Sequence, residues 1–288
     1  MAAADNEWQG TTGLWTTAGN WSDGVPDASD RVRINSTAMD ITAGDAQSAI
    51  TVTELQVGAG FVGTCHTAAL PLYIGATNFR YAARQCTSFN LRLAACTSFL
   101  VNDTHPTIQS LYLLNSTITT GIVQGGIGAV FDGASSAITT LVVQRDITDL
   151  TKPAPMVKLA SGVPLTNLYV LDGVVRVQNR PTNIYVGFGA TVYIEGTTTG
   201  TITLVDQWGG MVYYNSKLTI ITTYNGRRGF LDMSQSADEK RIATINAYSG
   251  WDYNANNGQG TNDIGTVNNF GFSKQIEPFR AMTPAAIN

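Results

Sequence analysis

The sequence predicts an all-β protein, a right-handed parallel β-helix in which short coils stack into a solenoid. Three observations support this fold. No stretch keeps apolar residues at the i, i+3, i+4, i+7 spacing of an amphipathic helix. Short alternating apolar runs recur on either side of glycine-containing turns, which is typical of strands. The runs also recur at a nearly constant interval, which suits a coil that buries its apolar face only by stacking on its neighbours.

The repeat is clearest between Asn167 and Leu231, where four copies follow one another. In each copy two apolar residues lie two positions apart, so they point to the same face of a strand. A turn containing glycine follows, because glycine adopts positive φ without a steric penalty, and a second alternating run comes after it. The first strands are led at nearly even intervals by Leu168, Ile184, Ile202 and Leu218, and the second strands by Val175, Val192 and Val212.

The N-terminal half repeats less regularly. The stretch from 121 to 163 breaks the register, and we expect a coil with an inserted loop there. Before it, apolar strands at slightly wider intervals lie near Arg31, Thr53, Leu72, Leu91 and Leu111.

Antiparallel hairpins remain the alternative to stacked coils. A β-sandwich or jelly roll would also show strands at short, regular intervals. Asp-Gly and Asn-Gly pairs are typical of hairpin turns, and they stand at Asp132–Gly133, Asp172–Gly173 and Asn225–Gly226.

Three tryptophans precede the first expected strand. Trp8, Trp15 and Trp21 fall within fourteen positions, and large aromatic side chains can cover the open end of a stack. A sugar-binding platform is the alternative role for these rings. The C-terminal residues, rich in Asn and Gly, either dock on neighbours in an assembly or fold back along their own solenoid. We therefore predict an N-terminal arm and Trp-rich cap at 1–30, a β-helix at 31–248 and a C-terminal arm at 249–288.

The residues after Trp15 carry the most specific pattern in the chain. It reads Asn20-Trp21-Ser22, Gly24, Pro26, Asp30, Val32 and Ile34. This pattern resembles the opening segment of β-helical autotransporter passengers and of tailed-bacteriophage virion proteins. The resemblance is specific from Trp15 to Ile34, and beyond this segment only the style of repeat is similar. We expect the phage type, because MAAADNEWQG has neither the basic region nor the apolar region of a signal peptide.

The composition argues against several classes of partner. Charged residues make up 13% of the chain, about half of the usual share, and the formal net charge is −4. Lysine and arginine form no run that could neutralise phosphates, so we expect no nucleic acid partner. No apolar stretch approaches the roughly 20 residues that span a membrane, and we expect synthesis in a host cytoplasm. Three cysteines without CxxC spacing predict buried thiols at Cys65, Cys86 and Cys96.

We expect no catalytic activity, no cofactor and no bound metal. Polysaccharide-cleaving sites on β-helices need several carboxylates on one face, whereas the acids here are spread thinly. We interpret the closest carboxylate pair as turn residues, the densest charge run as a solvated loop, and the two histidines as isolated from any nucleophile or metal motif. The closest carboxylate pair is Asp146 with Asp149, and the densest charge run is Asp238–Glu239–Lys240–Arg241. The two histidines are His66 and His105, and Asp172 with Arg176 is a further charged grouping.

Together with the resemblance, these features predict a bacteriophage capsid decoration (cement) protein on the head surface of the virion. Such proteins usually are trimers, so we expect a homotrimer that binds the major capsid protein through linked weak contacts. The alternatives are a tail spike or fibre domain that binds a host glycan, and a polysaccharide depolymerase. Aromatic residues are enriched in interfaces. The trimer contact is therefore expected at Trp208, Tyr213, Tyr214, Tyr224 and Phe230, with packing inside the coil as their alternative role.

Overall fold

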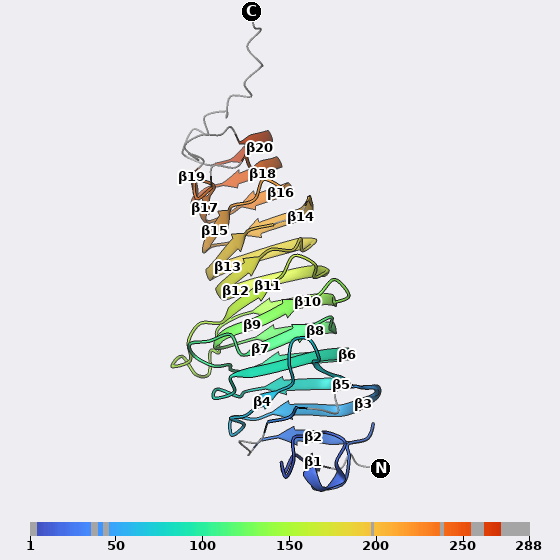
Figure 1. Ribbon diagram of the computed structural model, residues 1–288. Coiled ribbons are helices and arrows are strands. Elements are labelled where there is room, and N and C mark those ends of the chain that lie inside the picture. The colour runs from blue at the N-terminus through green and yellow to red at the C-terminus, as the bar shows by residue number, and fades with distance from the viewer. Residues whose placement is uncertain are drawn as a thin grey trace, which may run out of the picture. The chain divides into compact units, whose positions relative to one another are not determined.

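The chain folds as a stack of parallel β-strands. The computed structural model describes residues 5–35, 40–42, 46–196, 199–236, 239–254 and 262–271. Within each of the two units described next, the regular pairings between strands are parallel. The chain divides into two compact units, residues 1–166 and 167–288. Each unit is a β-solenoid, with about 11 turns in all, and Figure 1 shows the strands layered one after another within each unit.

Unit 1 has two sheet faces. The first is built by the pairs β1–β2, β2–β3, β3–β5, β5–β6, β6–β8 and β8–β10, and the second by β4–β6, β6–β7, β7–β9 and β9–β11. The long strands β3, β5 and β6 have a bulge in their register where they turn. The elements are β1 (Asp5–Glu7), the 3-10 turn η1 (Ala18–Asn20), β2 (Arg31–Ile34), β3 (Ala46–Val57), β4 (Thr64–Cys65), β5 (Leu72–Tyr81), β6 (Ser88–Val101), β7 (Leu111–Leu114), β8 (Thr117–Val123), β9 (Ile127–Asp132), β10 (Ala137–Val143) and β11 (Met156–Leu159).

The core of unit 1 consists of apolar side chains stacked from coil to coil. Side chains alternate along each strand, so every second residue enters the core. Phe79 of β5 and Phe99 of β6 are register partners, and their rings stack with centroids 5.1 Å apart. The predicted buried thiols are confirmed, because Cys65, Cys86 and Cys96 are free and buried. Burial raises the pKa of all three thiols, to about 12 for Cys96.

The three tryptophans pack against one another at the N-terminal end of unit 1. Trp8, Trp15 and Trp21 are at most 3% exposed. Trp21 contacts both other rings edge to face, with centroids 4.9 Å from Trp8 and 4.5 Å from Trp15. Its indole N–H donates to the Trp15 carbonyl oxygen at 2.7 Å. The three rings thus lie where a cap was predicted, although β1, inside the predicted arm, already pairs with β2.

Unit 2 repeats the two-faced coil. On the first face β13 pairs with β14, β14 with β16, β16 with β18, and β18 with β20. On the second face β13 pairs with β15, β15 with β17, and β17 with β19. β12 and β13 run through both faces, with a bulge between the two halves. The strands are β12 (Leu165–Val177), whose first two residues belong to unit 1, β13 (Asn183–Ile194), β14 (Gly200–Gln207), β15 (Met211–Tyr214), β16 (Thr219–Gly226), β17 (Gly229–Asp232), β18 (Arg241–Tyr248), β19 (Trp251–Asn254) and β20 (Asp263–Phe270).

The parallel β-helix predicted from the sequence is confirmed, and the parallel pairings exclude a sandwich or jelly roll for the described residues. Its right-handed sense stays a prediction. The inserted loop is also confirmed, as residues 144–155 between β10 and β11. The predicted register is correct for the first strands of the first two copies, where Leu168 pairs with Ile184. It is also correct for the second strands, where Val192 pairs with both Val175 and Val212.

The register predicted for the third and fourth first-face strands is wrong. Ile184 pairs with Val205 rather than with Ile202, and Ile202 pairs with Ile221 rather than with Leu218. Ile202 and Val205 are both fully buried. The apolar pattern therefore does not reveal which of them leads the strand. β13 pairs only with the last four residues of β14, Leu204–Gln207, so the partner of Ile184 is Val205.

The predicted end of the β-helix at residue 248 is also wrong. β19 pairs with β17 and β20 pairs with β18, so the solenoid continues to Phe270. The side chains of Ile264 and Val267 carry the apolar pattern of one more coil through a segment rich in Asn and Gly. Of the predicted C-terminal arm, residues 255–261 and 272–288 lie outside the described residues.

Candidate functional site

A partly exposed column of stacked side chains follows the corner of unit 2 where the chain passes from the first face to the second. It consists of Trp208, Arg227, Tyr248 and Phe270, one from each of four successive coils, and we call it the corner column. The Arg227 guanidinium carbon lies 4.4 Å from the Trp208 ring centroid and 5.1 Å from that of Tyr248. The Tyr248 and Phe270 rings stack with centroids 4.9 Å apart and planes 17° from parallel. The stack is therefore continuous over four coils.

Backbone pairing places these four side chains in line. Each of the first three follows a buried residue, and these buried residues are themselves register partners, Gln207 with Gly226 and Gly226 with Ala247. The backbone N–H of Arg227 donates to the Gln207 carbonyl oxygen at 2.9 Å. Strands in a sheet lie about 4.8 Å apart, which is also the favourable distance for stacking of planar groups. The main chain therefore sets the spacing of the column.

Asp206 orients two members of the corner column. Its Oδ2 accepts a hydrogen bond from the Trp208 indole N–H at 3.0 Å, and its Oδ1 accepts one from Arg227 Nε at 2.8 Å. The residue is only 8% exposed, so these charge-assisted bonds compensate for lost hydration of the carboxylate. The ring and the guanidinium are thus fixed relative to each other.

A buried hydrogen-bond network supports the column from inside. The Gln207 side-chain oxygen accepts from the Tyr224 hydroxyl at 2.6 Å and from the Trp251 indole N–H at 2.9 Å. The Gln207 amide donates to the carbonyl oxygens of Gly210 and Phe230, each at 3.1 Å. Burial raises the pKa of Tyr224 well above its ordinary value, so the hydroxyl stays protonated as a donor. Satisfied buried networks of this kind hold one conformation, so the column rests on a rigid base.

Apolar side chains extend the exposed surface toward the start of unit 2. Phe188 is 71% exposed and Leu171 46%, compared with 50% for Trp208. Phe188 lies against Gly209, where a Cβ would come within 2.6 Å of its ring. Glycine is therefore required for this close approach. Exposed apolar residues on neighbouring coils form a surface typical of binding sites rather than of scattered surface positions.

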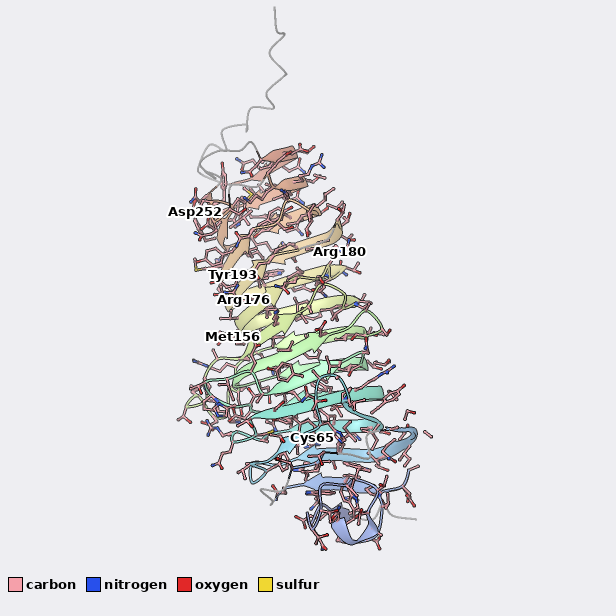
Figure 2. The ribbon with its side chains drawn as sticks, viewed as in Figure 1. Cys65, Met156, Arg176, Arg180, Tyr193 and Asp252 are labelled. Atoms are coloured by element: carbon pink, nitrogen blue, oxygen red, sulfur yellow. The ribbon has the colours of Figure 1, made fainter. Side chains whose placement is uncertain are left out.

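A second stack lies on the second face of unit 2. The Tyr193 ring lies between the Arg176 guanidinium, at 4.7 Å, and the Tyr213 ring, also at 4.7 Å. Arg176 is further held by Glu195 at 2.5 Å. Figure 2 shows Arg176 and Tyr193 next to each other along one edge of the molecule, with Arg180 at the opposite edge. Aromatic and cationic groups thus cover this face as well as the corner.

The five residues predicted for a contact between chains fall into two groups. Trp208, Tyr213 and Phe230 point outward on neighbouring coils, so they remain available for that role. Tyr214 and Tyr224 are fully buried, and their assignment to an interface is wrong. Tyr214 enters the core because it follows the inward-facing Val212 by two positions on the same strand.

The carboxylates singled out by the sequence stabilise local structure. Asp146 accepts from Lys152 Nζ at 2.6 Å and from the Thr148 hydroxyl at 2.6 Å, and these bonds lower its pKa well below its usual range. A hydrogen bond from the Thr151 hydroxyl lowers the pKa of Asp149. Both groups are therefore ionised turn residues rather than proton donors at neutral pH. Arg176, grouped with Asp172 in the sequence, pairs instead with Glu195.

The predicted solvated loop at 238–241 is wrong for one of its residues. Lys240 is fully buried, and its ammonium donates to the Ser236 carbonyl oxygen. The adjacent Arg241 does face outward, where it pairs with Asp263 at 3.2 Å. Asp238 lies outside the described residues. Lysine is buried here because its long side chain reaches a backbone acceptor in the preceding turn.

Both histidines lie in unit 1. His66 is 7% exposed and adopts a φ of 51°, and His105 accepts from the Thr107 backbone N–H in a turn. In the described ranges, His, Cys, Asp and Glu side chains nowhere gather in a group of three that could hold a metal ion. Nor does the described part of the chain contain a helix of the length and apolarity needed to cross a membrane.

Sequence reasoning missed three members of the corner column. Arg227, Tyr248 and Phe270 follow Trp208 at steps of one coil each, but these coils differ in length, so the predicted repeat does not align them. The column offers ring edges, apolar surface and one oriented guanidinium, which suits binding and supplies no acid–base pair.

No family model, curated protein or solved structure matches this chain.

Proposed function

We propose that this chain is a structural protein of a tailed-bacteriophage virion, a decoration (cement) protein that binds the outside of the head. The type of particle is suggested by the resemblance at Trp15 to Ile34. The observation that carries the binding role is the corner column, an exposed aromatic and cationic surface held rigid by Asp206 and Gln207. Binding surfaces are enriched in Trp, Tyr and Arg, and rigidity lowers the entropy lost on association.

The proposed mechanism is mechanical. A homotrimer would present three copies of the corner column to the major capsid protein, and linked contacts give higher avidity than a single one. Because it would bind only the assembled shell, the protein would shift the equilibrium toward assembly. Tyr213 and Phe230, on the face next to the column, are the proposed contacts between chains. No catalytic step is proposed, because the carboxylates of the inserted loop are engaged in turns.

Binding to purified heads that lack the protein tests this proposal. We expect Trp208→Ala and Arg227→Ala each to weaken co-sedimentation with heads at least about 10-fold, as hot-spot residues do. Leu70→Ala is the control. Leu70 is also an apolar residue, and it is 63% exposed, but it lies in unit 1. Equal binding by all three variants would contradict the role of the column, and density on the tail in electron micrographs would contradict the head location.

The trimer is tested separately by sedimentation equilibrium. The expected mass is three times the 30.7 kDa of one chain. Phe230→Asp should yield the monomer, because a charge would be buried without a partner at the contact. A monomeric wild-type chain at micromolar concentration would overturn the trimer.

Binding of a host glycan by a tail spike or fibre domain is the second candidate. The half-exposed Trp208 ring beside an oriented guanidinium favours it, since sugars stack on indole rings and their hydroxyl oxygens accept hydrogen bonds from a fixed guanidinium. Saturable glycan binding that is lost in Trp208→Ala, without binding to heads, would favour this function. Release of reducing sugar from a polysaccharide would instead indicate a depolymerase.

A further inference from the structure

The inserted loop of unit 1 exposes two aliphatic side chains to solvent. Ile147 is 87% exposed and Leu150 is 67% exposed. Among the described residues, no other large apolar side chain is as exposed as Ile147. Exposed aliphatic residues that lie close together on a surface are typical of contacts with a partner. These two have no part in the corner column, which lies in unit 2.

The loop is longer than closure of a coil requires. The chain passes from β8 to β9 through residues 124–126, whereas it passes from β10 to β11 through residues 144–155. Both connections join the same two faces of unit 1, because β10 pairs with β8 and β11 pairs with β9. The extra residues are therefore not needed to close the coil, and long loops on a rigid scaffold commonly carry binding residues.

Two successive turns hold the exposed side chains in place. Residues 146–151 read Asp-Ile-Thr-Asp-Leu-Thr, so one three-residue pattern occurs twice. Asp146 Oδ1 accepts from the backbone N–H of Thr148 at 2.9 Å and from its hydroxyl at 2.6 Å. Asp149 Oδ1 accepts the same two bonds from Thr151, at 3.1 Å and 2.5 Å. Side-chain bonds of this kind fix the backbone of a turn, and the middle residue of each copy is the exposed aliphatic one.

Charged side chains tie the loop to neighbouring corners of unit 1. Lys152 Nζ pairs with Asp146 at 2.6 Å, and the two side chains are only 17% and 11% exposed. The Lys152 stem also lies near Asp103, because a Cβ at Gly125 would be 3.5 Å from both Lys152 Cδ and Asp103 Oδ1. Asp103 is itself paired with Arg84 at 2.7 Å. The base of the loop is thus held in one position, and a pre-ordered contact loses less entropy on binding.

We propose that the inserted loop is a second contact with the major capsid protein, in which Ile147 and Leu150 enter an apolar cleft of that protein. The inference rests on the proposed function, because it takes the capsid as the partner. The hydroxyls and backbone N–H groups of Thr148 and Thr151 are already bonded within the loop, so its burial leaves few polar groups unpaired. A second linked contact raises the avidity beyond that of the corner column alone.

The charge of the loop favours a protein cleft over nucleic acid or lipid. Arg145 and Lys152 balance Asp146 and Asp149, so the side chains of residues 144–155 have a formal net charge of zero. Nucleic acids and anionic membranes attract segments with a positive charge. Insertion into hydrocarbon would also take Asp149, which lies between the two aliphatic residues, out of water. A cleft can receive both aliphatic side chains and leave this carboxylate at its rim.

Co-sedimentation with purified heads tests the contribution of the loop. We expect Ile147→Ala and Leu150→Ala each to weaken binding at least about 10-fold, as removal of a central interface side chain does. Leu70→Ala makes the same truncation at an exposed position of unit 1 and should bind like wild type. All three side chains are exposed, so the urea midpoints should be unchanged. Equal binding by wild type and both loop variants would overturn the inference and leave the proposed function intact.

Hydroxyl-radical footprinting identifies what covers the loop. On heads, oxidation of Ile147 and Leu150 should fall at least about 5-fold relative to the free protein, because the centre of an interface excludes water, whereas oxidation of Leu70 should not change. Protection of Trp208 without protection of Ile147 would refute the loop contact alone.

Two other occupants would also overturn the inference. Protection of Ile147 that appears without heads as the protein concentration rises would assign the loop to a second copy of the chain. Flotation with anionic lipid vesicles that is lost in Ile147→Ala would assign it to a membrane. Failure of the wild-type protein to bind heads at all would instead overturn the proposed function, and the capsid as partner with it.

Discussion

The tryptophan end of unit 1 makes a comparison possible between two similar truncations. Trp15→Phe and Trp21→Phe remove the same indole nitrogen and ring carbons from side chains that are 0% and 3% exposed. The lost apolar burial is therefore nearly equal. The hydrogen bonding of the two side chains differs. The Trp21 N–H donates to the Trp15 carbonyl oxygen, whereas Trp15 Nε1 is buried without a partner among the described residues.

The magnitudes follow from this difference. Removal of the Trp21 N–H leaves a buried carbonyl oxygen without its donor, which costs about 1–3 kcal/mol. Removal of the unpaired Trp15 N–H carries no such cost and relieves a desolvated donor. We expect Trp21→Phe to be less stable than Trp15→Phe by about 1–2 kcal/mol, whereas Trp15→Ala should lose about 4 kcal/mol through the cavity it creates.

Urea unfolding followed by far-UV circular dichroism measures these differences without relying on tryptophan fluorescence. The free energies of unfolding are comparable only if the slope m is the same in all variants. Hydrogen exchange of β1 and β2 amides is the local check, since damage to an end coil should first increase fraying there. Equal destabilisation by the two phenylalanine variants would refute the reasoning from the hydrogen bond.

Three further predictions concern the core and the inserted loop. Gly226→Ala places a Cβ within 2.3 Å of the Trp251 ring, so it should lower the free energy of unfolding by about 1–3 kcal/mol; an unchanged urea midpoint would contradict this. The three thiols should resist iodoacetamide at about pH 8 and react only in urea, because burial keeps them protonated and inaccessible, and mass spectrometry of the native protein would expose a modified cysteine as a counterexample. Asp146 has a lowered pKa in the folded chain, so its contribution to stability is present above about pH 4 and is lost as the pH falls further. Asp146→Asn should therefore lower stability at neutral pH and flatten its acid dependence, and parallel pH profiles for the two proteins would contradict the role of the Lys152 pair.

The fold was predictable because alternation and turns are local signals. Every second residue of a strand faces the core, and this pattern identified the partners Leu168 and Ile184. The same pattern also showed that Tyr214 shares a face with Val212, although the assignment of Tyr214 to an interface ignored it. Register between distant strands is a different matter, because Ile202 and Val205 are both apolar and only the pairing of their backbones decides between them.

The corner column could not be predicted from the sequence for the same reason. Trp208 and Phe270 are far apart in the chain, and their alignment depends on the lengths of three successive coils. The hydrogen bonds that Asp206 accepts from Trp208 and Arg227 could not be predicted either, since an acid two positions before a tryptophan gives no signal by itself. The exposed character of Trp208 was anticipated, whereas its neighbours Arg227 and Tyr248 become visible only once the register is known.

The uneven coil lengths of unit 2 have a consequence for how such a chain can change over evolutionary time. Successive register partners run from Leu168 through Ile184, Val205, Tyr224 and Ile245 to Val267. The first step along the chain is the shortest and the last is the longest, yet pairing continues from strand to strand. Residues can therefore be gained or lost in the connections while the strands keep their partners. Homologous chains could then differ widely in length and in loops and still present side chains in the same rows.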